Sequence, residues 1–119
     1  MVATTGPDCQ QYPGVLKLNP PKTELVNTTD LEDMTRTCLK RWTNAQGLPP
    51  NKIIMYRDGV SESQYKAVVE SEYNTIRGVA DKFCSDKGHE APKMTVIICG
   101  KRHHVSRFAG SHCYRLIAC

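Results

Sequence analysis

Two short apolar runs constrain the fold of this chain more than any other feature of its sequence. Residues 52–56 are Lys-Ile-Ile-Met-Tyr and residues 94–99 are Met-Thr-Val-Ile-Ile-Cys, and proline or glycine bounds each run. Each run is too short for a helix and is typical of a strand buried on both faces. Since about forty residues separate them, the runs suit neighbouring parallel strands, over 52–57 and 94–99, that are joined by a crossover helix.

The segment between the two runs carries the pattern of that crossover helix. Ser61 and Gln64 match a capping box at its start, and apolar residues then recur at helical spacing as far as about Cys84. The apolar stripe consists of Tyr65, Val68, Val69, Tyr73, Ile76, Val79, Ala80 and Phe83. A helix over about 62–84 between two parallel strands predicts an α/β fold, with helices packed against parallel central strands.

A further helix is predicted upstream, over about residues 30–45. Its apolar face would consist of Leu31, Met34, Cys38, Leu39 and Trp42. Thr29 and Glu32 match a capping box at its start, and Gly47 marks its end. Before this helix, residues 15–18 alternate between apolar and polar, which favours a short edge strand.

Length and composition set the limits within which these elements must pack. The chain has 119 residues, 39% hydrophobic and 24% charged, which is typical of one soluble domain or less. No run approaches the 18 or so apolar residues that a membrane helix needs, and the first residues lack a signal peptide. We therefore expect a cytoplasmic protein without a membrane partner, whose six cysteines are buried thiols rather than disulfides.

Asp58 is the first candidate for chemistry. It follows the carboxyl end of a predicted buried strand, which is where open α/β sheets place ligands and catalytic groups. An aspartate before a glycine is also common in simple turns, so both interpretations stay open. Phosphodiester cleavage with Mg²⁺ needs several carboxylates around two metal ions, and a single aspartate cannot supply them.

A basic cluster follows the second predicted strand. It consists of Lys101, Arg102, His103 and His104, with Arg107 shortly after. If the strands are parallel, this cluster emerges on the same edge of the sheet as Asp58, on the order of 10–15 Å from it. Such residues could hold phosphates beside the carboxylate, or they could form a solvated basic loop. A net charge of +4 is compatible with a polyanionic partner without requiring one.

A zinc site is a competing interpretation of the same region. Its ligands would be Cys99, His103 or His104, His112 and Cys113. These residues lack the Cys-x₂-Cys or His-x₃-His spacing that structural zinc sites usually have. The sequence therefore favours cysteines packed as small apolar residues at the ends of elements.

Two blocks of sequence resemble the PIWI domain of eukaryotic Argonaute proteins. Residues 53–65 include Tyr-Arg-Asp-Gly-Val-Ser-Glu, which is similar to the segment that follows a central strand in that family, and residues 94–104 end in a similar Lys-Arg-His-His loop. The resemblance covers about residues 15–108, and Leu48-Pro49 resembles fungal members in particular. It implies a partial RNase H-like fold and a role in RNA silencing, also called RNA interference.

The resemblance also implies roles for individual residues. Asp58 matches the second aspartate of the catalytic tetrad, which binds Mg²⁺, and Glu24 matches the glutamate finger that completes it. The matches to positions that approach the guide strand are Lys101, Arg102, His104 and Arg107. The implied cofactor is Mg²⁺, expected only in a complete PIWI domain, and the implied partners are a small guide RNA and a target RNA.

The chain departs from the family at both ends. The family's first catalytic aspartate lies upstream of anything present here, and its fourth ligand, a His or Asp, lies downstream. We therefore expect an irregular segment over 1–14, a partial PIWI domain over 15–108 and a divergent tail over 109–119. Such a fragment would bind nucleic acid by descent, without acting as an independent slicing endoribonuclease. The alternative is a non-catalytic interaction fragment or truncated gene product that binds no RNA and self-associates through an exposed sheet edge.

Overall fold

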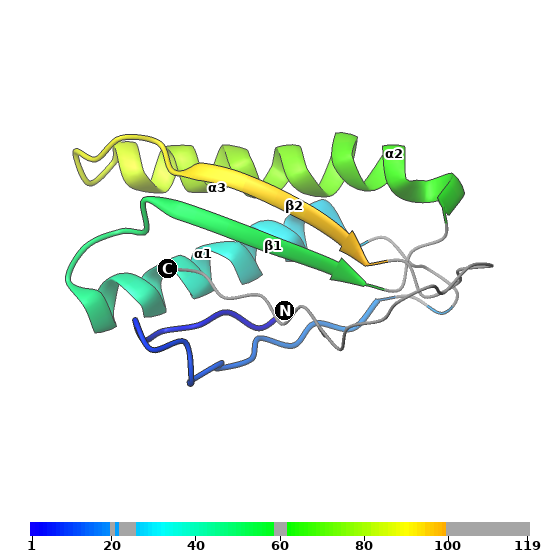
Figure 1. Cartoon of the computed structure of the whole chain (residues 1–119). Helices are drawn as coiled ribbons and strands as arrows, with labels where there is room; N and C mark the ends of the chain where they lie inside the picture. The colour runs from blue at the N-terminus through cyan, green and yellow to red at the C-terminus, as the bar shows by residue number, and fades with distance from the viewer. Residues whose placement is uncertain (20, 22–25, 59–61, 100–119) are drawn as a thin grey trace, which may run out of the picture.

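The computed structural model describes residues 1–19, 21, 26–58 and 62–99. An irregular N-terminal segment precedes the helix α1 (Thr28–Gln46), which is followed by the strand β1 (Lys52–Asp58). A long helical run and the strand β2 (Lys93–Cys99) complete the described part. The helical run consists of η1 (Glu62–Gln64), α2 (Tyr65–Ala67), the π-helical η2 (Val68–Tyr73) and α3 (Asn74–Ser85). Figure 1 shows these elements in order along the chain.

The two strands pair in parallel, as the spacing of the apolar runs predicts. Lys52 of β1 is the partner of Lys93, and the register continues without a break to Asp58 and Cys99. The helical run from Glu62 to Ser85 connects them, so the predicted strand-helix-strand unit is confirmed. The fold is a partial α/β arrangement in which both strands end at the same edge of the sheet (Figure 1).

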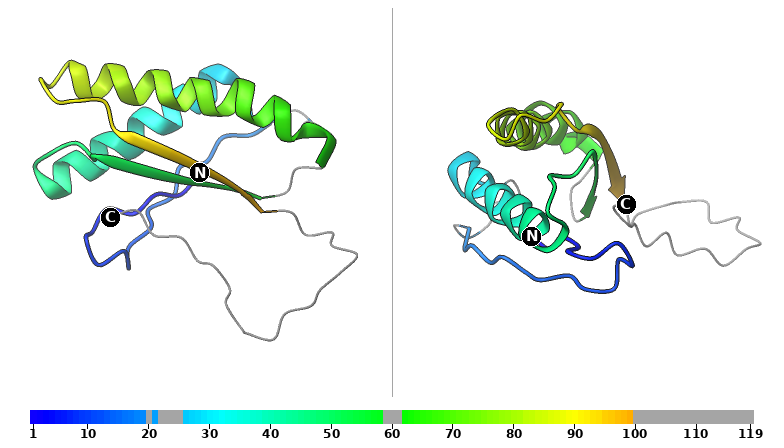
Figure 2. Two further views of the ribbon diagram at one scale, coloured as in Figure 1. Left: turned by 45° about the horizontal axis from the view of Figure 1, so that its top comes forward. Right: turned by 90° about the vertical axis from the view of Figure 1, so that its left-hand side faces the viewer.

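Both long helices cover the same face of the sheet. Leu39 of α1 packs with Val79, Ala80 and Phe83 of α3, and Ile53 of β1 lies against that cluster. A second cluster joins Leu31, Met34 and Ile76, with Met55 and Met94 of the two strands against it. Figure 2 shows the helices together on one side of the strands. The core is therefore the layer between α1, α3 and one face of the sheet.

The prediction that residues 94–99 form a strand buried on both faces is wrong. Burial alternates along β2, and Ile97 is 40% exposed. Because successive side chains of a strand point to opposite faces, helices on one face bury only alternate residues. Residues 52–56 are likewise only partly buried, apart from an exposed Lys52. The continuous apolar runs reflect a sheet face that the described residues leave open.

The helix α1 is capped differently from the prediction. Its N-cap is Asn27, whose side-chain oxygen accepts a hydrogen bond from the Thr29 N–H at 2.9 Å, so the capping box assigned to Thr29 and Glu32 is wrong. Asparagine is as strong a cap as any residue, and it starts the helix two residues earlier than predicted. At the other end, Gly47 adopts a left-handed φ of 78° and donates its N–H to Thr43.

The predicted edge strand over 15–18 is not formed. The N-terminal segment has one isolated antiparallel bridge between Val2 and Gly14, and Val15 exchanges two hydrogen bonds with Met1. Beyond Val15, the side chains of Leu16 and Leu18 are 84% and 87% exposed. Alternation alone predicted a strand, but a strand also needs a partner along its length, and this one has a partner at its first residue only.

Four described cysteines are free thiols, in agreement with the expectation of thiols rather than disulfides. Cys9, Cys38 and Cys84 are buried, and burial raises the pKa of the Cys38 and Cys84 thiols. Both therefore stay protonated and act as small apolar side chains. No helix in the described residues is long and apolar enough to cross a membrane.

Two glycines should respond in opposite ways to substitution by alanine. Gly47→Ala forces a side chain into the left-handed region, and should lower the free energy of unfolding by about 1 kcal/mol. Gly78→Ala lies inside α3, where an added Cβ meets no atom within 4 Å, and should raise it by about 0.5–1 kcal/mol. Urea unfolding followed by circular dichroism measures both. Equal effects of the two substitutions would contradict the assigned end of α1.

Candidate functional site at the carboxyl end of the sheet

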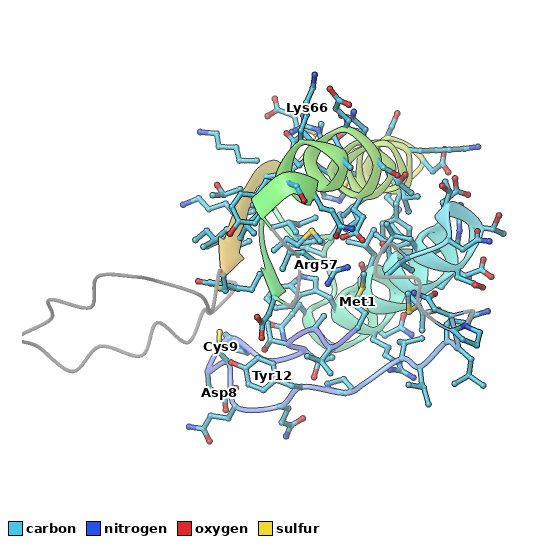
Figure 3. All side chains as sticks on the ribbon, turned by 90° about the vertical axis from the view of Figure 1, so that its right-hand side faces the viewer. Met1, Asp8, Cys9, Tyr12, Arg57 and Lys66 are labelled. Carbon is cyan, nitrogen blue, oxygen red and sulfur yellow. The ribbon has the colours of Figure 1, made fainter. Side chains whose placement is uncertain are left out.

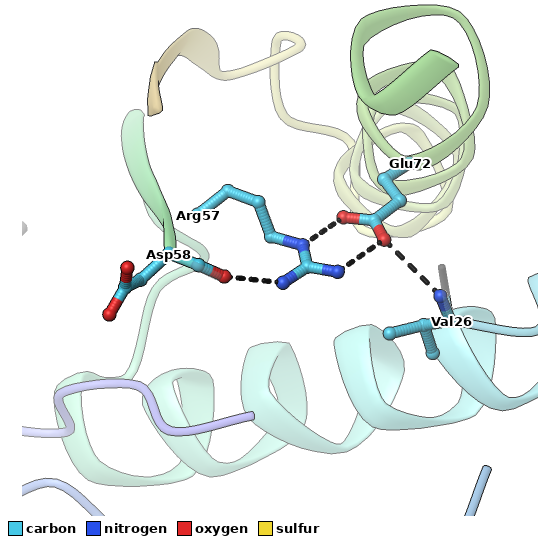
Figure 4. Close-up of polar contacts among 4 residues, drawn as sticks. All are labelled: Val26, Arg57, Asp58 and Glu72. Atoms are coloured by element: carbon cyan, nitrogen blue, oxygen red, sulfur yellow. Dashed lines mark hydrogen bonds and ion pairs between the residues drawn. The ribbon is translucent and has the colours of Figure 1, made fainter. Parts of the chain in front are cut away.

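The carboxyl ends of β1 and β2 lie level with each other. Asp58, the last residue of β1, is the register partner of Cys99, the last residue of β2. Asp58 is exposed, and Figure 4 shows its carboxylate on the side of β1 away from Glu72. The predicted phosphate-binding residues Lys101, Arg102, His104 and Arg107 lie outside the described residues. What the structure establishes is that β2 ends beside Asp58, so the chain leaves β2 at the same edge.

An ion pair between Arg57 and Glu72 lies directly beneath this edge. The Arg57 Nε donates to Glu72 Oε2 at 2.7 Å, and its Nη2 donates to Glu72 Oε1 at 3.1 Å. The Glu72 side chain is 1% exposed and that of Arg57 is 18% exposed. A two-point pair between a guanidinium and a carboxylate is among the stronger polar interactions in proteins.

The same carboxylate also binds the chain before α1. Glu72 Oε1 accepts a hydrogen bond from the Val26 N–H at 3.2 Å, and Arg57 Nη1 donates to the backbone carbonyl of Asp58 at 2.7 Å. Figure 4 shows the four residues as one connected group. Glu72 therefore ties the helical run, the end of β1 and the start of α1 together at one point.

The sequence analysis assigned no role to Arg57 or Glu72, although the sequence contains a signal. Glu72 falls at helical spacing before Ile76, Val79 and Phe83, so it occupies the buried stripe of the crossover helix. A glutamate on an apolar stripe must find a compensating partner when it is buried. That requirement identifies Glu72 as structurally important, but the pattern does not say which cation it binds.

An apolar cavity of about 780 Å³ adjoins the ion pair. It lies between α1, β1 and the N-terminal segment, and its lining includes Met1, Tyr12, Met34 and Met55, with Arg57 among the polar residues. Figure 3, viewed toward this end of the molecule, shows Met1 and Arg57 near one another and Tyr12 on the N-terminal segment. Along this side of β1, the described residues place no second strand against it.

The described residues test the expected metal chemistry only in part. Asp58 offers an exposed carboxylate, which suits one oxygen ligand of Mg²⁺. However, no group of three or more His, Cys, Asp or Glu residues that could hold a metal ion occurs within 1–19, 21, 26–58 and 62–99. Glu24 lies outside these residues, as do His103, His104, His112 and Cys113 of the zinc interpretation. The described part therefore supplies one ligand and not a complete site.

Tyr56 is a polar group near the same end of β1. Desolvation, with a smaller contribution from Cys99, raises the pKa of the Tyr56 hydroxyl. The hydroxyl therefore stays protonated at neutral pH, so Tyr56 adds no negative charge beside Asp58.

This chain is similar to a known protein family over almost its whole length. The family model of the Piwi domain matches residues 1–114. Argonaute 18 of Oryza sativa subsp. japonica is 31% identical over 89% of this chain and 9% of its own length. Argonaute 7 of Arabidopsis thaliana is 31% identical over 86% of this chain and 10% of its own length, and argonaute 10 of the same plant is 40% identical over 66% and 8%. The chain thus spans about a tenth of the length of these relatives.

The Arg57–Glu72 pair should matter far more for stability than a surface pair on the same helical run. Glu72→Gln should lower the free energy of unfolding by about 3 kcal/mol, because it leaves the Arg57 charge uncompensated in a largely buried site. The matched control is Glu70→Gln, which removes an exposed pair with Lys66 and should change it by less than about 0.5 kcal/mol. Urea unfolding of both variants measures the difference. Similar losses would show that the buried pair is not a central interaction.

Proposed function

This chain belongs to the Piwi domain family of the Argonaute proteins, and on that premise we propose that it binds a small guide RNA and its target in RNA silencing without cleaving RNA on its own. The observation that carries the proposal is the level ending of two parallel strands, β1 at Asp58 and β2 at Cys99. Each ending lies within one of the two sequence blocks that resemble the family. The partial α/β fold supports the same assignment.

The proposed contacts to RNA come from the segment after β2. Lys101, Arg102, His104 and Arg107 follow Cys99 in the sequence and supply basic or imidazole donors for phosphate oxygens. Their proposed role rests on the family resemblance and on the edge of the sheet at which β2 ends. Because they carry no base-reading geometry in this proposal, the binding is independent of RNA sequence.

The proposed metal-binding residues are Asp58 and Glu24. Asp58 would hold Mg²⁺ as one carboxylate ligand, and Glu24 would complete the set as a glutamate finger. Supporting this assignment is the position of Asp58 at the exposed carboxyl end of a strand. In a complete site, Mg²⁺ ions stabilise the attacking and leaving oxygens of a phosphodiester. Two carboxylates are too few for that task, so the proposal excludes independent cleavage.

The location of the chain in the cell, its domain bounds, its origin and its partners are also part of the proposal. Cytoplasmic location and a partial Piwi domain over 15–108 with a divergent tail over 109–119 remain predictions from the sequence. Fungal origin remains a prediction as well, and the plant relatives described above give it no support. Guide and target RNA are partners proposed through the family.

A second candidate function is association with another protein, or with a second copy, without RNA. Among the described residues, β1 pairs with β2 alone, and a cavity of about 780 Å³ adjoins its other side. Both favour association, because an unpaired strand edge beside apolar surface promotes pairing between chains. Under this alternative, the molecular mass in sedimentation would rise with concentration and RNA would not bind. Under the proposed function, RNA binds whether or not the mass changes.

We expect the purified chain to bind single-stranded RNA weakly, with micromolar or weaker affinity at physiological salt. Three or four phosphate contacts would give a slope of log affinity against log salt of roughly −2 to −3. Neutralising Lys101 and Arg102 together should weaken binding and flatten the slope by roughly 1 to 1.5. Lys40→Gln with Lys66→Gln removes two exposed lysines elsewhere and serves as the control. Equal effects of the two double variants would contradict a specific RNA-binding loop.

The chain should not cleave a guide-paired target RNA in Mg²⁺. Cleavage by this chemistry requires several ligands around two metal ions, and the proposal assigns only Asp58 and Glu24 to that role. Asp58→Ala should leave RNA binding almost unchanged, because this carboxylate makes no phosphate contact in the proposal. Gel analysis of a labelled target measures cleavage, and filter binding measures affinity. Cleavage that depends on Mg²⁺ and disappears in Asp58→Ala would overturn the proposal that the chain is inactive alone.

A further inference from the structure

The side of β1 away from β2 presents backbone hydrogen-bonding groups to the cavity. The Lys93 N–H donates to the Asn51 carbonyl at 2.9 Å, so the odd-numbered residues of β1 direct their backbone groups toward β2. Because consecutive residues of a strand direct these groups to opposite sides, Ile54 and Tyr56 direct theirs away from β2. Among the described residues β1 pairs with β2 alone, so the cavity faces an unpaired edge.

The cavity has the form of a slot along this edge. Its lining includes residues 52–57 of β1, residues 1–4 of the N-terminal segment and much of the apolar face of α1. Figure 1 shows the N-terminal segment on the side of β1 away from β2. A slot bounded in this way accommodates one extended segment. A second copy's sheet, with its own helices, would meet α1 and the N-terminal segment before it reached β1.

A buried hydroxyl in the lining lacks a hydrogen bond. Tyr56 lines the cavity, and its Oη atom is buried without a partner among the described residues. A buried polar atom that makes no hydrogen bond destabilises the fold, and so do unpaired backbone groups beside apolar surface. The occupant that fits this lining therefore combines backbone donors and acceptors with apolar side chains.

An apolar run of this chain beyond β2 has that character. Residues 114–119 are Tyr-Arg-Leu-Ile-Ala-Cys, and they lie outside the described residues. As a strand this run would extend about 20 Å, which matches the length of residues 52–57 in the lining. Cys99, the last described residue, itself lines the cavity. The chain therefore leaves the described structure beside the slot, and residues 100–113 have only to cross about 10 Å, two strand spacings, to reach its far side.

We propose that residues 114–119 form a third strand of the sheet, which fills the cavity and pairs with the unpaired edge of β1. The strand runs antiparallel to β1, because it then begins at the edge where β2 ends. A parallel strand would need a crossover back along the whole sheet. The inference goes beyond the proposed function, since it involves no contact to RNA.

The alternation of side chains along this strand fits the two sides of the slot. Tyr114, Leu116 and Ala118 share one face, which packs against the apolar face of α1. Arg115 and Ile117 lie on the other face, which continues the side of the sheet that α1 and α3 leave open.

Amide hydrogen exchange of the whole chain, followed by ¹⁵N NMR, tests this pairing within a single strand. The amides of Ile53 and Met55 bond to β2 in any case, whereas those of Ile54 and Tyr56 are protected only when the other edge is occupied. In the unmodified chain, we expect all four amides to be protected. Rapid exchange of Ile54 and Tyr56 beside slow exchange of Ile53 and Met55 overturns the proposal.

A double variant identifies the segment that protects the edge. Leu116→Asp with Ile117→Asp places charges on both faces of the proposed strand, and should speed exchange at Ile54 and Tyr56 at least about tenfold. The control is Leu16→Asp with Leu18→Asp, which adds the same charges at side chains that are 84% and 87% exposed, and should leave exchange unchanged. Equal effects of the two double variants overturn the assignment of the edge to residues 114–119.

Nuclear Overhauser effects in the unmodified chain supply a measurement that requires no variant. Opposed residues of antiparallel strands bring their Hα protons close together, so we expect Hα–Hα contacts between residues 53–57 and residues 114–119. If the Leu116 and Ile117 double variant does not fold, which loss of protection at Ile53 and Met55 would reveal, these contacts decide the question. Contacts from β1 to any other segment overturn the proposal.

The remaining alternative is that a second copy occupies the edge. Protection of Ile54 and Tyr56 would then rise with protein concentration, together with the molecular mass in sedimentation, and this result overturns the proposal. Pairing within one chain requires protection that stays the same on tenfold dilution, at a constant monomeric mass.

Discussion

A carboxylate that is 1% exposed must be compensated where it is buried, and the Glu72 carboxylate imposes that constraint on the described fold. Its three hydrogen bonds come from Arg57 on β1 and from the backbone of Val26 before α1. Segments 46 and 15 residues away from Glu72 in the sequence therefore meet at one point. Apolar packing alone would tolerate small shifts between helix and strand, whereas this group of charges fixes their relative position.

The arrangement of layers explains where chemistry can occur. Because α1 and α3 cover one face of the sheet, the other face and the side of β1 next to the cavity remain open in the described residues. The carboxyl ends of β1 and β2 lie at a common edge, and the Asp58 carboxylate lies there on the side of β1 away from Glu72.

Several features were predictable from local pattern. The apolar runs at 52–57 and 94–99 gave the two strands, and the stripe through Ile76 and Phe83 gave the helix between them. The sequence prediction failed where the same residue pattern is compatible with two different local structures. Residues 15–18 alternate like a strand but find a partner only at Val15, and Asn27 caps α1 in place of the motif at Thr29. The roles of Glu24 and of residues 101–107 remain predictions.

The sequence by itself determined the order and type of the main elements, the family and the position of Asp58 after a strand, because these depend on residue spacing and short motifs. Only the tertiary structure decided that both helices share one face of the sheet and that Arg57 binds Glu72. Those facts depend on contacts between segments far apart in the chain. Spacing shows that Glu72 faces the core, but only packing determines which cation reaches it.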